Sequence, residues 1–336
     1  MVAMRNRQRA PLLLLVTLLG ALAAPAEGQA DPPPGGGDPE LLVTGLAGGS
    51  GSTVGPDGAL YVPEPVSGEV TRIEPETGAT TVVASCLPPQ VLVGEAGGAM
   101  DVAFLGSTMY ALTSMVSEDV GGSAVTGVFR VEEGTCEVVA DIGAWTMANP
   151  PPPDFDFFVP TGVPYAMEAY QGGFLVTDGH ANRVLQVTLD GQVRTVLQLG
   201  NVVPLGLDVV DRTVYSTLAG PVPHLPEDGQ VLSLDVGSGD SELVASGGRL
   251  LIDVEAGRHA LYALAQGDFP EGGPEGSPAL PDTGQLLVAD RAGGFDVVAG
   301  GLDRPTSMEV VDGNGYVVTY DGEVWRIEDL PGCRHR

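Results

Sequence analysis

The 336-residue chain contains no lysine, so its 15 basic residues are all arginine, set against 44 acidic residues. The formal net charge is −29. A surface this acidic repels nucleic acid and anionic lipid and favours cations or basic partners, so we expect no nucleic-acid ligand. Solubility is the simplest role for so much charge.

Long apolar runs are missing beyond the N-terminus. Three arginines between residues 5 and 9 precede an apolar stretch at 11–22, and an A-x-A cleavage site follows at 24–26. This order is typical of a secretory signal, so we expect residues 1–26 to be removed and the protein to be secreted, with no membrane insertion. The composition of residues 27–40 predicts a Pro/Gly-rich linker.

Catalytic motifs are absent as well. No H-x-E, C-x-x-C, G-x-S-x-G or Gly-rich phosphate motif occurs in a supporting context. We therefore assign no catalytic residue; the missing motifs favour a protein that is not an enzyme but do not exclude one.

What the sequence does contain is a repeat. An apolar pair, usually ending in Tyr, follows a small or acidic residue after seven or eight positions, six times in all. The six pairs of positions are Thr53 and Tyr61, Ala103 and Tyr110, Glu168 and Leu175, Asp208 and Tyr215, Glu255 and Tyr262, and Glu309 and Tyr316. Such a period is typical of radial or stacked modules.

Each repeat contains four short, β-branched pieces separated by turn residues. In the second repeat these pieces span 101–105, 109–112, 127–131 and 136–140. Four antiparallel strands repeated radially predict an all-β fold, a six-bladed β-propeller over residues 41–330 with a tail at 331–336. The sixth repeat lacks its outer strand, and residues 41–46 match that pattern, so we expect the N-terminal strand to complete the last blade.

The long insertions all fall in loops that the propeller geometry places on one face. They occupy 114–126, 145–164, 218–229 and 266–284. Binding residues concentrate on long loops held by a rigid scaffold, so we interpret this insertion-rich face as the working face. Surface drift would produce the same loops without any function.

Acidic residues recur at one register of the innermost strand. Glu168, Asp208, Glu255 and Glu309 each lie seven residues before the reference position of the second strand, so we expect them on one circle around the axis. One interpretation is a cation site, with Ca²⁺ as the ion that oxygen ligands favour. The alternative is a water-filled channel lined by solvated carboxylates.

Four further side chains are candidate ligand-binding residues on the insertion-rich face. Asp178, His180 and Asn182 occupy a tight turn, and His224 lies in the insertion at 218–229. Asp and Asn in turns commonly bond to local backbone, and a single His is often structural.

The three cysteines, Cys86, Cys136 and Cys333, are an odd count for a secreted chain. Outer strands run the same way in every blade, which places Cys86 and Cys136 at opposite faces. A disulfide needs Cα atoms within about 7 Å. We therefore predict no bridge between these two residues.

Several segments occur in the order seen in the ScyD/ScyE family of exported propellers. They are Asp101-Val-Ala-Phe-Leu-Gly106, Trp145-Thr-Met-Ala-Asn-Pro150, Phe174-Leu-Val-Thr-Asp178 with Asn182, and Leu218-Ala-Gly-Pro-Val-Pro223 with Gly229-Gln-Val231. Val54-Gly-Pro-Asp-Gly-Ala-Leu-Tyr-Val62 also resembles NHL-like propellers. The resemblance implies a six-bladed exported propeller and little chemistry, and the chain departs from it at the four strand-one acids.

Three functions fit these observations. The first is a non-catalytic binding or scaffold module for a protein, glycan or small molecule, which we expect to be a monomer. The second is a Ca²⁺-dependent hydrolase or lactonase, because a resemblance to gluconolactonase-type propellers implies one metal at the channel mouth. Its nearest candidate ligands are Glu64, Asn182, Asp208 and Asp253, although the expected Asn-Gly segment is missing. The third is a structural envelope protein.

Overall fold

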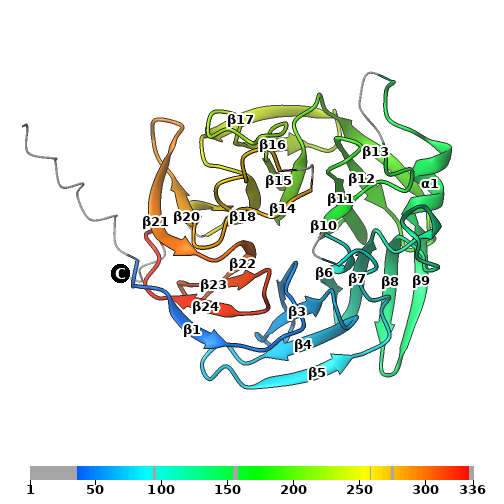
Figure 1. Cartoon of the computed structure of the whole chain (residues 1–336), viewed down its shortest axis with the longest axis horizontal. Helices are drawn as coiled ribbons and strands as arrows, with labels where there is room; N and C mark the ends of the chain where they lie inside the picture. The colour runs from blue at the N-terminus through cyan, green and yellow to red at the C-terminus, as the bar shows by residue number, and fades with distance from the viewer. Residues whose placement is uncertain (1–35, 94–95, 154–157, 258, 274–275, 333–336) are drawn as a thin grey trace, which may run out of the picture. The chain divides into compact units, whose positions relative to one another are not determined.

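The computed structural model describes residues 36–93, 96–153, 158–257, 259–273 and 276–332, which belong to one compact unit. Within it, six four-stranded antiparallel sheets are arranged around a central axis (Figure 1). This confirms the six-bladed propeller. The predicted signal, most of the predicted linker and Cys333 lie outside the described residues. No helix in the described part is long and apolar enough to cross a membrane.

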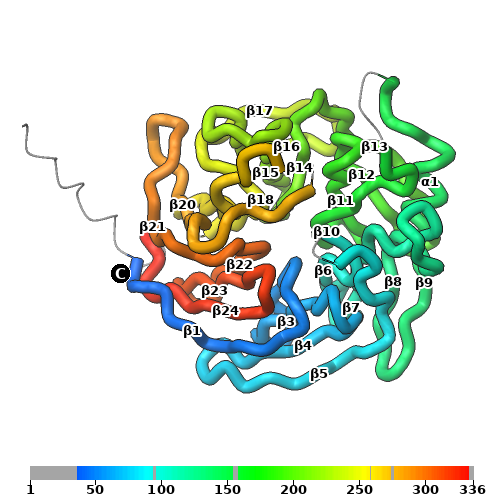
Figure 2. Tube along the Cα trace, viewed as in Figure 1, coloured from blue at the N-terminus to red at the C-terminus, as the bar shows by residue number. Residues whose placement is uncertain are grey.

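The strands follow the chain blade by blade, from the axis outward (Figure 2). Blade one contains β2 (Thr53–Val54), β3 (Leu60–Glu64), β4 (Glu69–Ile73) and β5 (Thr80–Ala84). Blade two contains β6 (Gly98–Leu105), β7 (Thr108–Ser114), β8 (Gly127–Glu132) and β9 (Thr135–Asp141). Blade three contains β10 (Pro164–Tyr170), β11 (Gly173–Asp178), β12 (Arg183–Val187) and β13 (Val193–Gln198).

The remaining blades have the same order. Blade four contains β14 (Pro204–Val210), β15 (Thr213–Leu218), β16 (Gln230–Asp235) and β17 (Asp240–Ser246). Blade five contains β18 (Leu251–Ala256), β19 (Leu261–Ala265), β20 (Gly284–Ala289) and β21 (Phe295–Leu302). Blade six contains β22 (Pro305–Val311), β23 (Asn314–Thr319), β24 (Val324–Ile327) and β1 (Glu40–Val43).

The ring closes where the ends of the propeller meet. β1 pairs antiparallel with β24, and Leu41 lies opposite Trp325. Arg326 and Glu40 add an ion pair of 2.6 Å across the same two strands. This confirms the predicted closure, which leaves β24 with no free edge toward solvent.

The apolar pairs of the repeat form the core between blades. Six hydrophobic clusters lie one at each blade interface. In the cluster between blades two and three, for example, the rings of Tyr110 and Phe174 lie 4.9 Å apart. A blade alone leaves these faces exposed, so the blades stabilise one another around the ring.

A β-bulge recurs in the innermost strand of five blades. The register between the first and second strands shifts in β6, β10, β14, β18 and β22. In each strand the shift lies just before the small or acidic residue that begins the repeat pattern, for example Ala103 in β6. A bulge adds one residue and re-aims the neighbouring side chains. Side chains on both sides of the shift can therefore face the axis, which simple alternation does not allow.

The prediction for the cysteines is wrong. Cys86 and Cys136 form a disulfide, with Cα atoms 5.6 Å apart. Figure 1 shows β5 running toward β8 and β9, and Leu87 packs in one cluster with Phe129 and Cys136. The prediction treated blades as flat, whereas strand twist carries the end of one outer strand across the neighbouring blade.

One short helix interrupts the predicted insertion at 145–164. α1 (Ile142–Ala148) begins at Asp141, whose Oδ1 accepts a hydrogen bond from the Ala144 amide at 2.8 Å. It ends before a run of prolines, which disfavour helical backbone in the preceding residue. Seven residues are too few to produce a helical period in the sequence.

Candidate functional site

A cavity of about 590 Å³ opens on the insertion-rich face. All four predicted insertions contribute to its walls, through Met115, Phe158 and Val159, Pro221 and Val222, and Gly276 to Pro278. Its volume lies within the range of small-molecule sites. The insertions therefore converge on one concave space.

The floor of this cavity is a ring with one residue from each blade. Every member lies three positions before the small or acidic residue that begins the repeat pattern in its blade. The six members are Ser50, Met100, Tyr165, Leu205, Ile252 and Thr306. In blades two to six the β-bulge lies in this stretch of the strand. The bulge therefore explains how this ring and the acids deeper in the strands can all face the axis.

The walls carry few groups that could bind an anion. None of the described lining residues is an arginine, and the chain has no lysine. The ionisable lining residues, apart from Tyr165 and Tyr320, are Asp321, His180 and His224. A phosphate or carboxylate group would find no permanent cation in these walls.

Asp178, one of the predicted ligand residues, is fully buried and has a structural role. Its Oδ1 accepts hydrogen bonds from the amides of Val163 and Ala181, and its Oδ2 lies 3.2 Å from the guanidinium of Arg183. Arg183 also donates to the carbonyl of Asn149 and lies over the ring of Trp145. The pair therefore fastens α1 and the following loop to blade three.

The other three predicted ligand residues do line the cavity. His180 Nε2 accepts hydrogen bonds from the amides of Phe158 and Val159, at 2.9 and 3.0 Å, so the imidazole proton is on Nδ1. Asn182 Oδ1 accepts from the amides of Val202 and Val203.

His224 donates from Nδ1 to the carbonyl of Gly220 at 2.8 Å, and its ring lies 5.1 Å from that of Phe269. Together, His180, Asn182 and His224 position the loops that form the walls.

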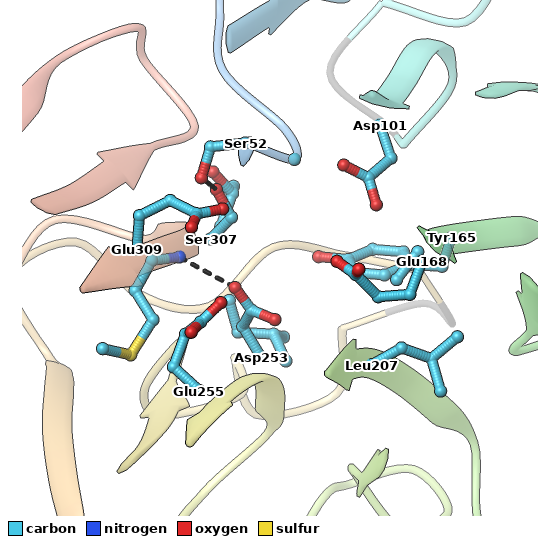
Figure 3. A pocket seen from close by; sticks show the side chains of 14 residues that line it. Ser52, Asp101, Tyr165, Glu168, Leu207, Asp253, Glu255, Ser307 and Glu309 are labelled. Atoms are coloured by element: carbon cyan, nitrogen blue, oxygen red, sulfur yellow. Dashed lines mark hydrogen bonds between the residues drawn. The ribbon is translucent and has the colours of Figure 1, made fainter. Parts of the chain in front are cut away.

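Below the floor, a narrow axial channel of about 20 Å³ is lined by carboxyl groups. Figure 3 shows Glu168, Glu255 and Glu309 directed toward one space, together with Asp101 and Asp253. The predicted circle of strand-one acids is therefore present for three of its four members. Asp208 lies at the same register without lining the channel, and its Oδ2 accepts from the Ala256 amide at 2.7 Å.

Asp101 is buried and the other carboxyl groups are half-buried. Burial raises the pKa of Glu168, Glu255 and Glu309 well above the usual value, and neighbouring carboxylates raise it further. Burial also raises the pKa of Asp208 and Asp101, the latter well above its usual value, and it raises the pKa of Asp253 to about 7. For Asp101, Glu168, Asp253, Glu255 and Glu309, the charged side chains that act on the pKa are other acids.

The sequence reasoning missed Asp101 and placed Asp253 only in the lactonase ligand set, not in the circle of strand-one acids. Asp101 lies two residues before Ala103, and Asp253 lies two residues before Glu255. Each side chain reaches across to the next blade. The amide of Met167 donates to Asp101 at 2.7 Å, and the amide of Met308 donates to Asp253 at 2.8 Å. A Cβ on Gly51 would lie 2.1 Å from Asp101 Oδ1, so the small neighbour leaves room for this carboxylate.

The cation site predicted at Glu168, Asp208, Glu255 and Glu309 stays a prediction. Among the described residues, no three His, Cys, Asp or Glu side chains are arranged to hold a metal ion. Two candidate ligands of the lactonase hypothesis accept hydrogen bonds within the fold. Glu64 accepts from the Ala47 amide at 2.6 Å and from the Thr71 hydroxyl, and Asn182 Oδ1 accepts from the Val202 amide.

Comparisons with known proteins show the fold and no family. No protein-family model matches this sequence, and the search of curated proteins found no match. Among solved structures, a gluconolactonase from Xanthomonas campestris shares 11% identity over 86% of this chain and 89% of its own, with a TM-score of 0.58.

Two other enzymes have similar folds. The PQQ-bound aldose sugar dehydrogenase of Streptomyces coelicolor shares 13% identity, covering 88% of this chain and 99% of its own, with a TM-score of 0.58. A streptogramin B lyase shares 10% identity, covering 87% of this chain and 98% of its own, with a TM-score of 0.52. These neighbours differ in chemistry, so the shared fold does not select an activity.

Proposed function

We propose that this protein is an exported binding module that holds an apolar, non-anionic small molecule in the cavity on its insertion-rich face. The observation that carries the proposal is the cavity itself. All four insertions contribute to its walls, and its lining is mainly apolar. A concave space of this size suits a small molecule better than a flat protein or glycan contact.

Export is part of the same proposal. It rests on the signal pattern at residues 1–26, on the resemblance to the exported ScyD/ScyE propellers, and on the disulfide, since such bonds persist in oxidising compartments. The proposal includes no catalytic step; Glu64 and Asn182, two candidate ligands of the lactonase hypothesis, accept backbone hydrogen bonds.

Binding can be tested with N-phenyl-1-naphthylamine, a neutral fluorophore that brightens in apolar surroundings, and with a set of uncharged aromatic compounds in thermal-shift assays. We expect saturable binding and a rise in Tm. Phe158, which lines the cavity, is 58% exposed, so Phe158→Ala should weaken binding by about tenfold with little loss of stability.

Leu225→Ala is the matched control. Leu225 is 44% exposed on the insertion at 218–229 but does not line the cavity, so this variant should bind like the wild type. Absence of saturable binding, or equal loss in both variants, would rule out the cavity as a ligand site.

A further inference from the structure

The cavity and the axial channel are adjacent along one axis. Tyr165, Ile252 and Thr306 belong to both, so the same residues form the floor of one and the upper wall of the other. Three residues of extended strand, roughly 10 Å, separate the floor ring from the ring of strand-one acids. A ligand on the floor therefore lies within the electrostatic reach of the carboxyl groups.

The channel is too small for the ligand itself. Its space of about 20 Å³ suits a single water molecule. The carboxyl groups would therefore act on a ligand through the floor, as a field in a poorly solvated interior, rather than by direct contact.

Glu255 and Glu309 are the groups most able to respond. Among the described residues, no hydrogen-bond donor to their carboxyl groups is found, in contrast to Asp101, Asp208 and Asp253. None of the described residues that line the channel is an arginine, and the chain has no lysine to neutralise them. A cation brought to the floor would therefore favour the ionised form of these two groups.

The lining also provides surfaces that suit an organic cation. Phe158 and Tyr165 place aromatic rings along the cavity, and aromatic faces attract alkylammonium groups. The ring of Tyr320 also lines the cavity, but the guanidinium of Arg304 already lies over it at 5.7 Å. An apolar body would contact the walls, while a diffuse positive charge needs no hydrogen-bond acceptor of its own.

We propose that the cavity takes an apolar organic cation, such as a quaternary ammonium compound, with its charge over the axial carboxyl groups. This inference rests on the proposed binding function and names the class of ligand. It adds a requirement for positive charge that the cavity alone does not impose.

The test uses two isosteric probes. One is (naphthalen-2-ylmethyl)trimethylammonium, and the other is 2-neopentylnaphthalene, in which carbon replaces the charged nitrogen. In 0.5 M NaCl, which screens the exposed surface charge but not buried groups, we expect the cation to bind at least about tenfold more tightly.

Proton release provides a second readout. The quaternary ammonium carries no titratable proton, so any proton released on binding comes from the protein. Burial and neighbouring carboxylates raise the pKa of Asp101, Glu168, Asp208, Asp253, Glu255 and Glu309, and a bound cation lowers it again. We expect calorimetry in two buffers of different ionisation enthalpy to detect release with the cation alone, and the cation's affinity to rise between pH 6 and pH 8.

Glu255→Gln/Glu309→Gln should reduce the preference for the cation to near unity, whereas the exposed control Glu242→Gln should retain it. Equal binding of both probes to the wild type would overturn the inference and leave the binding function intact. A preference that persists in the double variant would also overturn it. Failure of both probes to bind would overturn the inference and count against the binding function together.

Discussion

Asp253→Asn should flatten the pH dependence of stability. Burial raises the pKa of Asp253 to about 7 from an ordinary value of 3.8, against the hydrogen bonds that Met308 and Val254 amides donate to it. The folded chain therefore holds this proton up to about pH 7, whereas the unfolded chain loses it near pH 4. The resulting stabilisation is fully present below pH 4 and is lost as the pH rises through 7.

The magnitude follows from the interval between the pH of the measurement and the folded pKa. One pKa unit corresponds to about 1.4 kcal/mol, so raising the pH from 5 to 8 removes about 3 kcal/mol through this group. Asparagine cannot ionise, so the variant lacks this loss. Asparagine also loses one backbone hydrogen bond, which lowers stability at every pH and leaves the pH dependence unaffected.

Urea unfolding between pH 5 and pH 8 in 1 M NaCl measures the effect. At this salt the Debye length is about 3 Å, so the exposed carboxylates contribute little to the change with pH. The control is Asp296→Asn, which alters an exposed carboxylate of β21. If Asp253→Asn and the wild type lose stability in parallel, within about 1 kcal/mol, Asp253 is not a buried, protonated acid.

Three further predictions concern the scaffold. Asp178→Ala leaves the buried Arg183 without its partner and should destabilise the protein by about 3–5 kcal/mol in urea unfolding; a loss below about 1 kcal/mol would contradict the structural role of the pair. Cys86→Ser opens a link between residues 50 apart and should lower the free energy of unfolding by about 4 kcal/mol, an effect that reductant should reproduce in the wild type but not in Cys136→Ser. Deleting residues 40–43 exposes the edge of β24 and should cause association in size-exclusion chromatography, and a monomeric, equally stable product would contradict closure by β1.

The fold was predictable because each part of it repeats. The apolar pair occurs six times, so the strand that it marks is recognisable in every blade. The last repeat lacks an outer strand, and residues 41–46, at the other end of the propeller, have the outer-strand pattern. The disulfide was not predictable from this reasoning, since it depends on twist between neighbouring blades. Register along one strand does not report that twist.

The site was predictable only where one register describes it. Glu168, Glu255 and Glu309 share a position in the repeat, so their meeting at the axis followed from the alignment of the repeats. Asp101 and Asp253 occur in only two of six repeats at their register, and their role depends on hydrogen bonds to another blade. The floor ring depends on the bulge, which leaves no signature in a list of strand residues.

Five of the six axial acids fall into two groups with different explanations. Asp101, Asp208 and Asp253 accept backbone hydrogen bonds from the neighbouring blade, so their burial contributes to blade packing. Glu255 and Glu309 have no such compensation in the described structure, and their raised pKa values mean that ionisation of either opposes folding. Ionisable groups that lower the stability of the fold, with no hydrogen bond or ion pair to compensate, are typical of functional positions. These two glutamates lie under a cavity whose described lining contains no arginine, and the chain has no lysine. A positively charged ligand is therefore the partner that would make their burial favourable.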